Sequence, residues 1–314
     1  MARGSDSRCR VLVTGGTGFI GSHLCRALSR AGAAVEVWTQ PGSTAPPVLD
    51  ADLPNVEVYR IDVRGRDAVV AALAARPPDR VFHMAGIRLM GNRADNLARM
   101  FETNLLGALN VIEGVRADTR VVVVGSCEEY GRAPVPFRET QAAEAQTAYA
   151  ISRLATTLAC LALPSPPICL ARLAVVYGPG QTGDMFIPSL LAACAEHRPF
   201  AMTQGEQTRD FLYVEDAMRA LLALADTEAA MQQVVNVGTG VECTVRQVAE
   251  QAARLSGQGA DIRVGAIPSR PGEASRYVCA IDKMRSLTGW QPQVGLEEGL
   301  AKTLEWWQQR AARR

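Results

Sequence analysis

A glycine-rich turn between an apolar run and an amphipathic segment is the feature that most constrains the fold of this chain. The apolar run covers Val11 to Thr14, and Gly15, Gly18 and Gly21 follow with the spacing G-x-x-G-x-x-G. Gly15 permits a tight turn, Gly18 lets the backbone approach a pyrophosphate, and Gly21 lets a helix pack closely on the strand. Because the glycines stand between a strand end and a helix start, they predict a dinucleotide-binding loop.

Short apolar runs alternate with longer helical patterns from Arg10 to about Leu170. This order predicts an α/β fold with a Rossmann-type, doubly wound parallel sheet. The run from Val121 to Val124 is unbroken, as in a strand covered on both faces, so it is expected near the sheet centre. The six strands are expected at residues 11–14, 35–39, 56–61, 81–83, 121–125 and 168–171.

The alternation of strand and helix patterns is interrupted by proline and glycine at residues 164–167 and 177–183. We therefore expect a dinucleotide-binding domain over residues 1–175, to which about 206–240 also return. Residues 176–314 are expected to form mainly a smaller, mixed α/β part that binds substrate.

Composition excludes several function classes. The 33 basic and 32 acidic residues give a net charge of +1, so no broad field attracts nucleic acid or an anionic membrane. Eight cysteines without a C-x-x-C pair, beside only three histidines, favour free thiols in a reducing compartment over disulfides or a metal site. No apolar run approaches the roughly 18 residues of a membrane span. A cytoplasmic protein is expected.

The end of the second strand bears on the choice of cofactor. Thr39 stands where an NAD-selective site usually places an acid on the ribose hydroxyls. Without a carboxylate nothing repels a 2′-phosphate, so NAD or NADP is expected, with a slight preference for NADP. Asp62 is expected to hydrogen-bond the adenine or, alternatively, to cap a helix beginning near Arg66.

Two segments after the central strand carry candidate chemistry. Ser126 to Gly131 follow that strand, while Tyr149 and Arg153 lie one helical turn apart on one face. With the glycine loop, they resemble the extended short-chain dehydrogenase/reductase family, specifically its NAD(P)-dependent nucleotide-sugar epimerases, dehydratases and 4-ketoreductases. Further matching segments are residues 83–86, 103–107, 177–180, 209–214 and 270–273.

The resemblance implies that Tyr149 is the acid/base on a sugar hydroxyl or ketone and that Ser126 hydrogen-bonds the same oxygen. A phenol has a pKa near 10, so a neighbouring cation is needed for it to act as a base at neutral pH. The family supplies a lysine where this chain has Arg153, which keeps the charge but cannot join a proton relay. Retuned activity is expected, with a catalytically impaired binding protein as the alternative.

The residues after Ser126 bear on the reaction. Glu128 matches a glutamate used for proton work in dehydratases and decarboxylases, or it is an ordinary polar loop residue. The aspartate that precedes it in dehydratases is Cys127 here, so 4,6-dehydration is not expected. We expect a 4-ketoreductase of a deoxy keto sugar, and a 4-epimerase with retained NAD is the alternative.

The resemblance also implies a nucleotide-diphosphate sugar as substrate, with Arg209 and Arg270 on its diphosphate, because guanidinium groups suit phosphate oxygens. A homodimer formed by helices at 96–114 and 149–163 is a further expectation. The expected cofactor-binding residues are Gly15, Gly18, Phe19, Ile20, Gly21, Thr39, Asp62, Val63, Ala85, Gly86, Tyr149 and Arg153. The expected substrate-binding residues are Ser126, Cys127, Glu128, Arg209, Arg270 and Glu273, and the expected catalytic residues are Ser126, Tyr149, Arg153 and Glu128.

Overall fold

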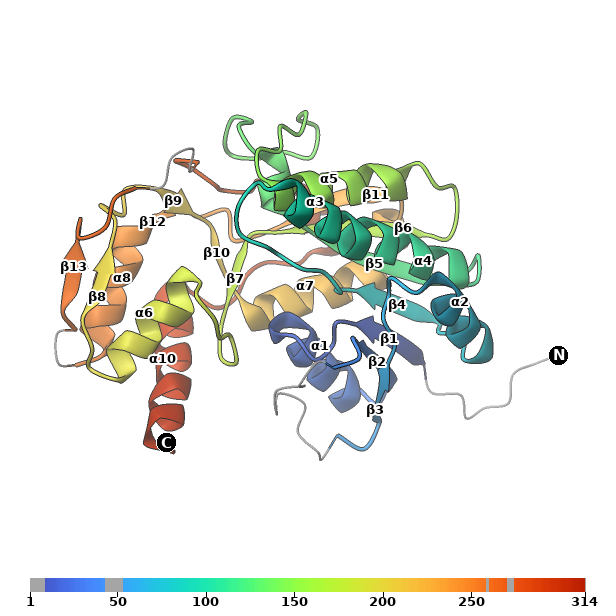
Figure 1. Ribbon diagram of the computed structural model, residues 1–314, viewed down its shortest axis with the longest axis horizontal. Helices are drawn as coiled ribbons and strands as arrows, with labels where there is room; N and C mark the ends of the chain where they lie inside the picture. Colours follow the sequence, from blue (N-terminus) through green and yellow to red (C-terminus); the bar gives the residue numbers. More distant parts are fainter. Residues whose placement is uncertain (1–8, 43–52, 258–259, 270–273, 314) are drawn as a thin grey trace. The chain divides into compact units, whose positions relative to one another are not determined.

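The computed structural model describes residues 9–42, 53–257, 260–269 and 274–313 (Figure 1). The chain divides into two compact units. The first comprises residues 1–131, 142–172 and 220–235, and the second comprises residues 132–141, 173–219 and 236–314.

A seven-stranded sheet organises the first unit, in the order β11-β6-β5-β4-β1-β2-β3. Its strands are β1 (Arg10–Thr14), β2 (Ala34–Thr39), β3 (Val56–Arg60), β4 (Arg80–His83), β5 (Arg120–Ser126), β6 (Ile168–Leu173) and β11 (Gln233–Val237). The pairs β1-β2, β1-β4, β2-β3 and β4-β5 are all parallel. The six predicted strands are thus confirmed, and the strand at Val121 lies next to the central β4.

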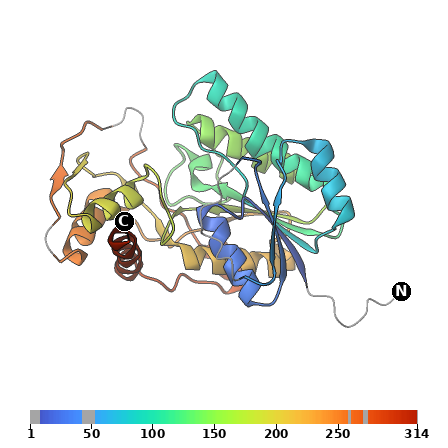
Figure 2. The same ribbon diagram turned by 60° about the horizontal axis from the view of Figure 1, so that its bottom comes forward.

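Helices cover both faces of this sheet (Figure 2). On one face lie α1 (Phe19–Arg30) and α7 (Val214–Asp226), the latter from residue 220 onward within this unit. On the other face lie α2 (Arg66–Ala75), α4 (Gly107–Gly114) and α5 (Ala148–Leu161). This two-sided covering confirms the Rossmann-type architecture and explains why β5 needs apolar side chains on both faces.

The core of this unit joins the sheet to the helices of the second face. Val121 and Val123 of β5 pack in one cluster with Leu73 of α2 and Val111 of α4. Burying each such side chain fully stabilises the fold by roughly 1.5–3 kcal/mol. The ends of the strands are therefore held in fixed positions, and the loops that follow them begin from a rigid base.

One helical run in this unit changes its winding. It begins as α3 (Ala94–Met100), continues as the π-helical η1 (Phe101–Leu106) and ends as α4. Such π segments are rare and often mark functional sites. Asn104, which is buried, lies within this segment.

The second unit contains three two-stranded sheets and four helices among its described residues. Strands β7 (Val175–Tyr177) and β10 (Phe211–Tyr213) pair in parallel, as do β8 (Phe200–Met202) and β13 (Ile262–Val264), while β9 (Thr208–Arg209) and β12 (Cys243–Thr244) are antiparallel. The helices are α6 (Phe186–Ala195), α8 (Val245–Leu255), α9 (Asp282–Thr288) and α10 (Leu296–Ala312), and α6, α8 and α10 pack on one another. Two short 3-10 turns complete the described elements, η2 (Cys127–Tyr130) of the first unit and η3 (Glu228–Ala230).

The thiols agree with the expectation from spacing. No disulfide joins any of the eight cysteines, all of which lie among the described residues, and six of them are buried. Within the described ranges, no helix is both long enough and apolar enough to span a bilayer.

Candidate active site

The turn after β1 is shaped by backbone contacts. Gly15 has φ +68°, its N–H donates to the Trp38 carbonyl at 2.9 Å, and its own carbonyl accepts from Gly18 N–H at 3.0 Å. Positive φ at this value favours glycine. A Cβ on Gly15 would also lie 2.9 Å from the backbone nitrogen of Ala85, which follows β4. The loops after β1 and β4 therefore touch, and only glycine fits between them.

Gly21 fixes the position of α1 against the same turn. A Cβ on Gly21 would lie 2.7 Å from the α-carbon of Gly16 and would also collide with the Gly15 carbonyl. The helix begins at Phe19, and its N-cap Gly18 has no side chain to occupy the first turn. Free N–H groups at a helix start form a ready anion site. This arrangement fits a pyrophosphate at the carboxyl end of β1.

A cavity of about 130 Å³ lies beside this turn. It is bounded by the loops that follow β1, β2, β3 and β4, so it opens at the carboxyl ends of the strands, where open α/β sheets bind ligands. Its lining residues are Gly15, Trp38, Thr39, Gln40, Ile61, Asp62, Val63, Arg64, Ala85, Gly86, Ile87 and Thr103. Six of the residues expected to bind the cofactor thus lie together.

Two polar side chains that are expected to contact the ribose and the adenine, Thr39 and Asp62, line that cavity. The Thr39 hydroxyl forms a buried pair with the Thr17 hydroxyl at 3.1 Å. Asp62 accepts two-pronged hydrogen bonds from the Arg64 guanidinium, with Nη2 to Oδ2 at 2.6 Å, and these bonds hold the pKa of Asp62 below its ordinary value. The N-cap of α2 is Gly65, without a side-chain cap. The alternative in which Asp62 caps this helix is therefore wrong.

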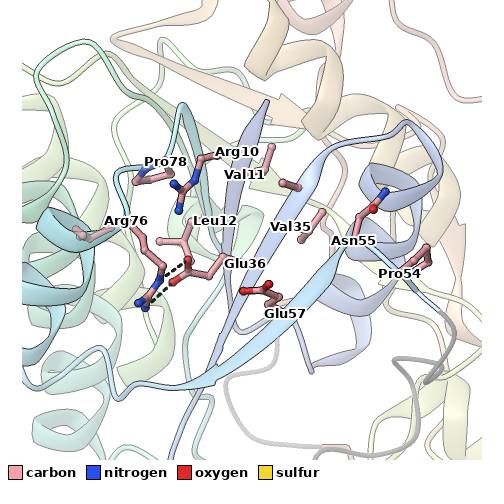
Figure 3. Close-up of a pocket in the computed structure, with 12 residues that line it drawn as sticks. Arg10, Val11, Leu12, Val35, Glu36, Pro54, Asn55, Glu57, Arg76 and Pro78 are labelled. Carbon is pink, nitrogen blue, oxygen red and sulfur yellow. Dashed lines mark hydrogen bonds and ion pairs between the residues drawn. The ribbon is translucent and has the colours of Figure 1, made fainter. Parts of the chain in front are cut away.

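A larger cavity, of about 240 Å³, lies toward the amino ends of β1 and β2 (Figure 3). Two of its charged side chains pair with each other, because Glu36 accepts from Arg76 (Nε to Oε2, 3.0 Å), and Glu36 also accepts from the Trp38 indole. Ligands of such sheets bind at the opposite, carboxyl ends. Size alone therefore does not identify the active site of this unit.

Helix α5 presents one face to the end of β5. Tyr149, Arg153 and Thr157 follow one another at intervals of four residues, so they lie along this face. The Thr147 hydroxyl caps the helix by accepting from Ala150 N–H at 3.1 Å. Arg153 donates from Nη1 to the Val124 carbonyl of β5 at 3.1 Å. The helix start, with Tyr149, is thereby fixed over the strand end.

Arg153 also contacts the loop after β4. Its guanidinium packs on Gly86, where an added Cβ would lie 2.8 Å from the guanidinium carbon and would collide with Nη2. The Arg153 side chain is buried, at 6% exposure. Because Gly86 lines the 130 Å³ cavity, it connects that cavity to the catalytic candidates of α5.

The turn after β5 separates two adjacent glutamates. The Ser126 hydroxyl accepts from Glu128 N–H at 3.2 Å, while Ser126 N–H donates to Glu129 Oε1 at 2.9 Å, which completes a capping box. Glu129 is fully buried and its Oε2 accepts from Arg172 Nε and the Thr157 hydroxyl, both at 2.8 Å. Glu129 therefore ties β5, β6 and α5 together, and it leaves Glu128 as the partly exposed carboxylate of the turn.

A second arginine reaches Tyr149 from the loop after β4. The Arg88 guanidinium carbon lies 5.3 Å from the centre of the Tyr149 ring, and that of Arg153 lies 5.5 Å from it. Arg88 Nη2 also pairs with Glu128 Oε1 at 3.1 Å. Arg88 was not among the residues expected from the sequence, although its place after a parallel strand, at the ligand-binding edge of the sheet, was a usable signal.

Buried polar groups fix the loop that carries Arg88. Asn104 accepts from Ile87 N–H at 2.8 Å and donates to the Ile87 carbonyl at 3.1 Å, and it also donates to Ser152 of α5 at 2.9 Å. At the start of this loop, His83 Nδ1 pairs with the Thr14 hydroxyl at 3.0 Å. Burial, and to a smaller extent the charge of Arg153, lowers the pKa of His83 to about 3, so this imidazole is neutral.

The expected substrate arginines belong to the second unit. Arg209, on β9, donates from Nη1 to the Thr208 and Ala274 carbonyls at 2.7 and 3.1 Å, and its guanidinium lies 5.0 Å from the Tyr277 ring centre. Arg270 and Glu273 lie outside the described residues. Cys127 belongs to the first unit and is buried.

Comparison with known proteins agrees with this geometry. The model of the NAD dependent epimerase/dehydratase family matches residues 11–238. A dTDP-glucose 4,6-dehydratase of Streptomyces niveus is 30% identical, over 96% of this chain and 94% of that protein.

Solved structures give the same result. The epimerase Mth375 of Methanothermobacter thermautotrophicus superposes with a TM-score of 0.88 and 31% identity, over 98% of this chain and 94% of that one. MoeE5, solved with UDP-glucuronic acid and NAD, has a TM-score of 0.83 and 30% identity, over 96% of this chain and 99% of that one. The resemblance to the nucleotide-sugar branch of the extended short-chain dehydrogenases/reductases is confirmed. The chain belongs to the NAD dependent epimerase/dehydratase family and is an enzyme of the oxidoreductase or epimerase type.

Proposed function

We propose that this enzyme exchanges a hydride between NAD and C4 of the sugar of a nucleotide-diphosphate sugar, and that its net reaction is reduction of a 4-keto group. The observation that carries the proposal is the position of Gly86. This residue lines the cavity of Gly15, Thr39 and Asp62, and it also packs on Arg153. A dinucleotide held in the cavity would therefore end beside the α5 face that carries the proposed acid.

The residues of this site fit a dinucleotide. Gly15, Gly18 and the first turn of α1 would hold the pyrophosphate, and Thr39 and Asp62 would contact the ribose and adenine. Bound NADH would supply the hydride. We assign Tyr149 the role of protonating the alkoxide at C4, with Ser126 hydrogen-bonded to the same oxygen.

The distribution of carboxylates favours reduction over dehydration. Loss of water from the sugar needs an acid for the leaving hydroxyl in addition to the acid/base at C4. Of the two glutamates in the turn, Glu129 is buried and bonded to Arg172, while Glu128 is paired with Arg88. The residue between Ser126 and Glu128 is a buried cysteine. This turn therefore supplies no unpaired carboxylate for a dehydration step.

We propose NAD rather than NADP. MoeE5 was solved with NAD, and the matching family is described as NAD dependent, so the slight preference for NADP is not supported. The Thr39 hydroxyl is paired with that of Thr17 in a buried position. It offers a ribose hydroxyl a neutral partner and offers a 2′-phosphate no positive charge.

A 4-epimerase with retained NAD is the second candidate, because Mth375 is named an epimerase. The experiment that separates the two begins with mass spectrometry of the cofactor released from purified protein. NADH absorbance is then followed with a panel of 4-keto nucleotide sugars. Consumption of NADH supports the reductase, whereas tightly held NAD with product isomers and no net consumption makes the enzyme an epimerase.

A third outcome concerns Arg153. Binding of cofactor and nucleotide sugar without turnover, unrelieved by Arg153→Lys, would instead support the catalytically impaired binding protein. The diphosphate contacts of Arg209, Arg270 and Glu273, the homodimer and the cytoplasmic location stay predictions beside this proposal. For the homodimer, support comes from exposed Leu106 and Leu158 on the two expected helices, at 50% and 59% exposure.

A further inference from the structure

Two guanidinium groups lie near the ring of Tyr149, at almost the same distance. The guanidinium carbons of Arg88 and Arg153 are 5.3 and 5.5 Å from the ring centre. They come from different segments, the loop after β4 and helix α5. Both distances fall within the range of a cation over an aromatic face.

The surroundings of Arg153 limit what its charge can do alone. Nη1 is bonded to the Val124 carbonyl, the guanidinium rests on Gly86, and the Nε atom has no hydrogen-bond partner among the described residues. Arg153 therefore fills the space under the loop after β4. A planar head held in this way cannot turn toward a phenol as the ammonium of a lysine can.

Arg88 approaches from the open side. Its side chain is 44% exposed and pairs with Glu128, whose side chain is 20% exposed. The loop of Arg88 is fastened on both sides of it, by Asn104 on Ile87 and by Asn92, whose Oδ1 accepts from Ala148 N–H at 2.9 Å. Arg88 is thus placed over Tyr149 by the fold.

The charged side chains described near the Tyr149 phenol can be added to give a net charge. Arg88 and Arg153 contribute two positive charges and Glu128 one negative charge, so the described groups in this cluster leave a net charge of +1. Without Arg88 the sum becomes zero, and a phenolate next to it loses its electrostatic support.

We propose that Arg88 is a positioning residue for the Tyr149 phenol and, together with Arg153, supplies the positive charge that the family resemblance assigns to one lysine. The proposal rests on the proposed function, in which Tyr149 is the proton donor and acceptor. In this proposal the Arg88–Glu128 ion pair has a role, because Glu128 holds the Arg88 guanidinium over the Tyr149 ring. It also explains how the site tolerates an arginine at position 153.

The test measures ionisation of this phenol directly and needs no substrate. Ultraviolet absorbance of tyrosinate is titrated in each protein and in the same protein carrying Tyr149→Phe, so that the difference isolates one of the six tyrosines. Arg88→Ala is expected to move the midpoint of this difference upward by about one pH unit, since an adjacent charge has effects of this size. An unchanged midpoint in Arg88→Ala overturns the proposal.

Three variants separate charge from structure. Arg88→Lys keeps the charge and is expected to keep the wild-type midpoint. Arg88→Ala with Glu128→Gln returns the net charge to +1 and is expected to return the midpoint toward the wild type. Arg93→Ala removes an exposed arginine of the same loop and is expected to change nothing. A midpoint that moves equally in Arg93→Ala would contradict a local role for Arg88.

Folding and function are controlled separately. Circular dichroism checks each variant, and Arg88→Met, which keeps much of the apolar stem, replaces Arg88→Ala if the latter unfolds. The pH dependence of kcat/KM on an active keto sugar should show the same displacement as the titration. If no nucleotide sugar is turned over, the proposed function fails, but the titration still decides the role of Arg88.

Discussion

The turn after β1 and the segment around Tyr149 hold the two halves of the proposed site by different means. At the turn, backbone atoms make the contacts, and Gly15 and Gly21 are required because a Cβ would collide with main chain. At Tyr149, long side chains make the contacts, through Arg88, Arg153 and the buried Glu129. The first half is therefore intolerant of added atoms, and the second half is sensitive to lost charge.

The largest effect is expected at Tyr149, the proposed acid/base. Tyr149→Phe should lower kcat by about 10²- to 10⁴-fold, the usual contribution of a positioned acid or base. Cofactor affinity and melting temperature should stay near wild type, because the ring and its cation contacts remain. Steady-state kinetics measures kcat, and calorimetry measures the cofactor affinity and the melting temperature. Activity within a few-fold of wild type would remove Tyr149 from its proposed role.

Substitutions in the buried Glu129–Arg172 pair test whether side-chain contacts stabilise the half of the site around Tyr149. Glu129→Ala should lower the free energy of unfolding by about 3–5 kcal/mol, because it leaves the Arg172 charge buried and unpaired. Urea denaturation measures the loss. The double variant Glu129→Leu with Arg172→Met should recover most of it, since apolar replacement of a buried pair is often neutral. A loss near zero in the single variant would mean that the pair is unimportant for stability.

A substitution in the glycine turn tests the backbone packing of the half of the site that follows β1. Gly21→Ala should cost about 1–3 kcal/mol, as overpacking does, and should weaken NAD binding because α1 must move away from the turn. The matched control is Gly295→Ala at the N-cap of α10, where nothing lies within 4 Å of the added Cβ; it should cost at most about 1 kcal/mol, as loss of an N-cap glycine does, and should leave NAD binding unchanged. Equal costs at both positions would contradict the packing argument.

The smallest effect is expected at the contact between Gly86 and Arg153, which connects the two halves of the proposed site. Gly86→Ala should push the Arg153 guanidinium from its place and weaken NAD binding, and Arg153→Lys in the same protein should relieve this. A double-mutant cycle on NAD affinity is expected to give a coupling of about 1 kcal/mol. Additive effects would mean that Gly86 and Arg153 act independently.

The same comparison explains what the sequence could predict. The glycine turn, the six strands and the Tyr149–Arg153 spacing are local, so each could be inferred from neighbouring residues. The contact of Arg88 with Tyr149 could not be inferred, because it depends on a loop fastened to α5 by Asn104 and Asn92. Spacing also could not separate Glu128 from Glu129, since only the position of Arg172 on β6 makes one of them internal.

Isotope transfer tests the central claim most directly. The enzyme is loaded with NADH that carries deuterium at the transferable position, mixed with a 4-keto nucleotide sugar, and the product is analysed by NMR. The account predicts deuterium at C4 of the sugar, and predicts that Tyr149→Phe slows its appearance. Deuterium at another carbon, or none in a product that nevertheless forms, would contradict it.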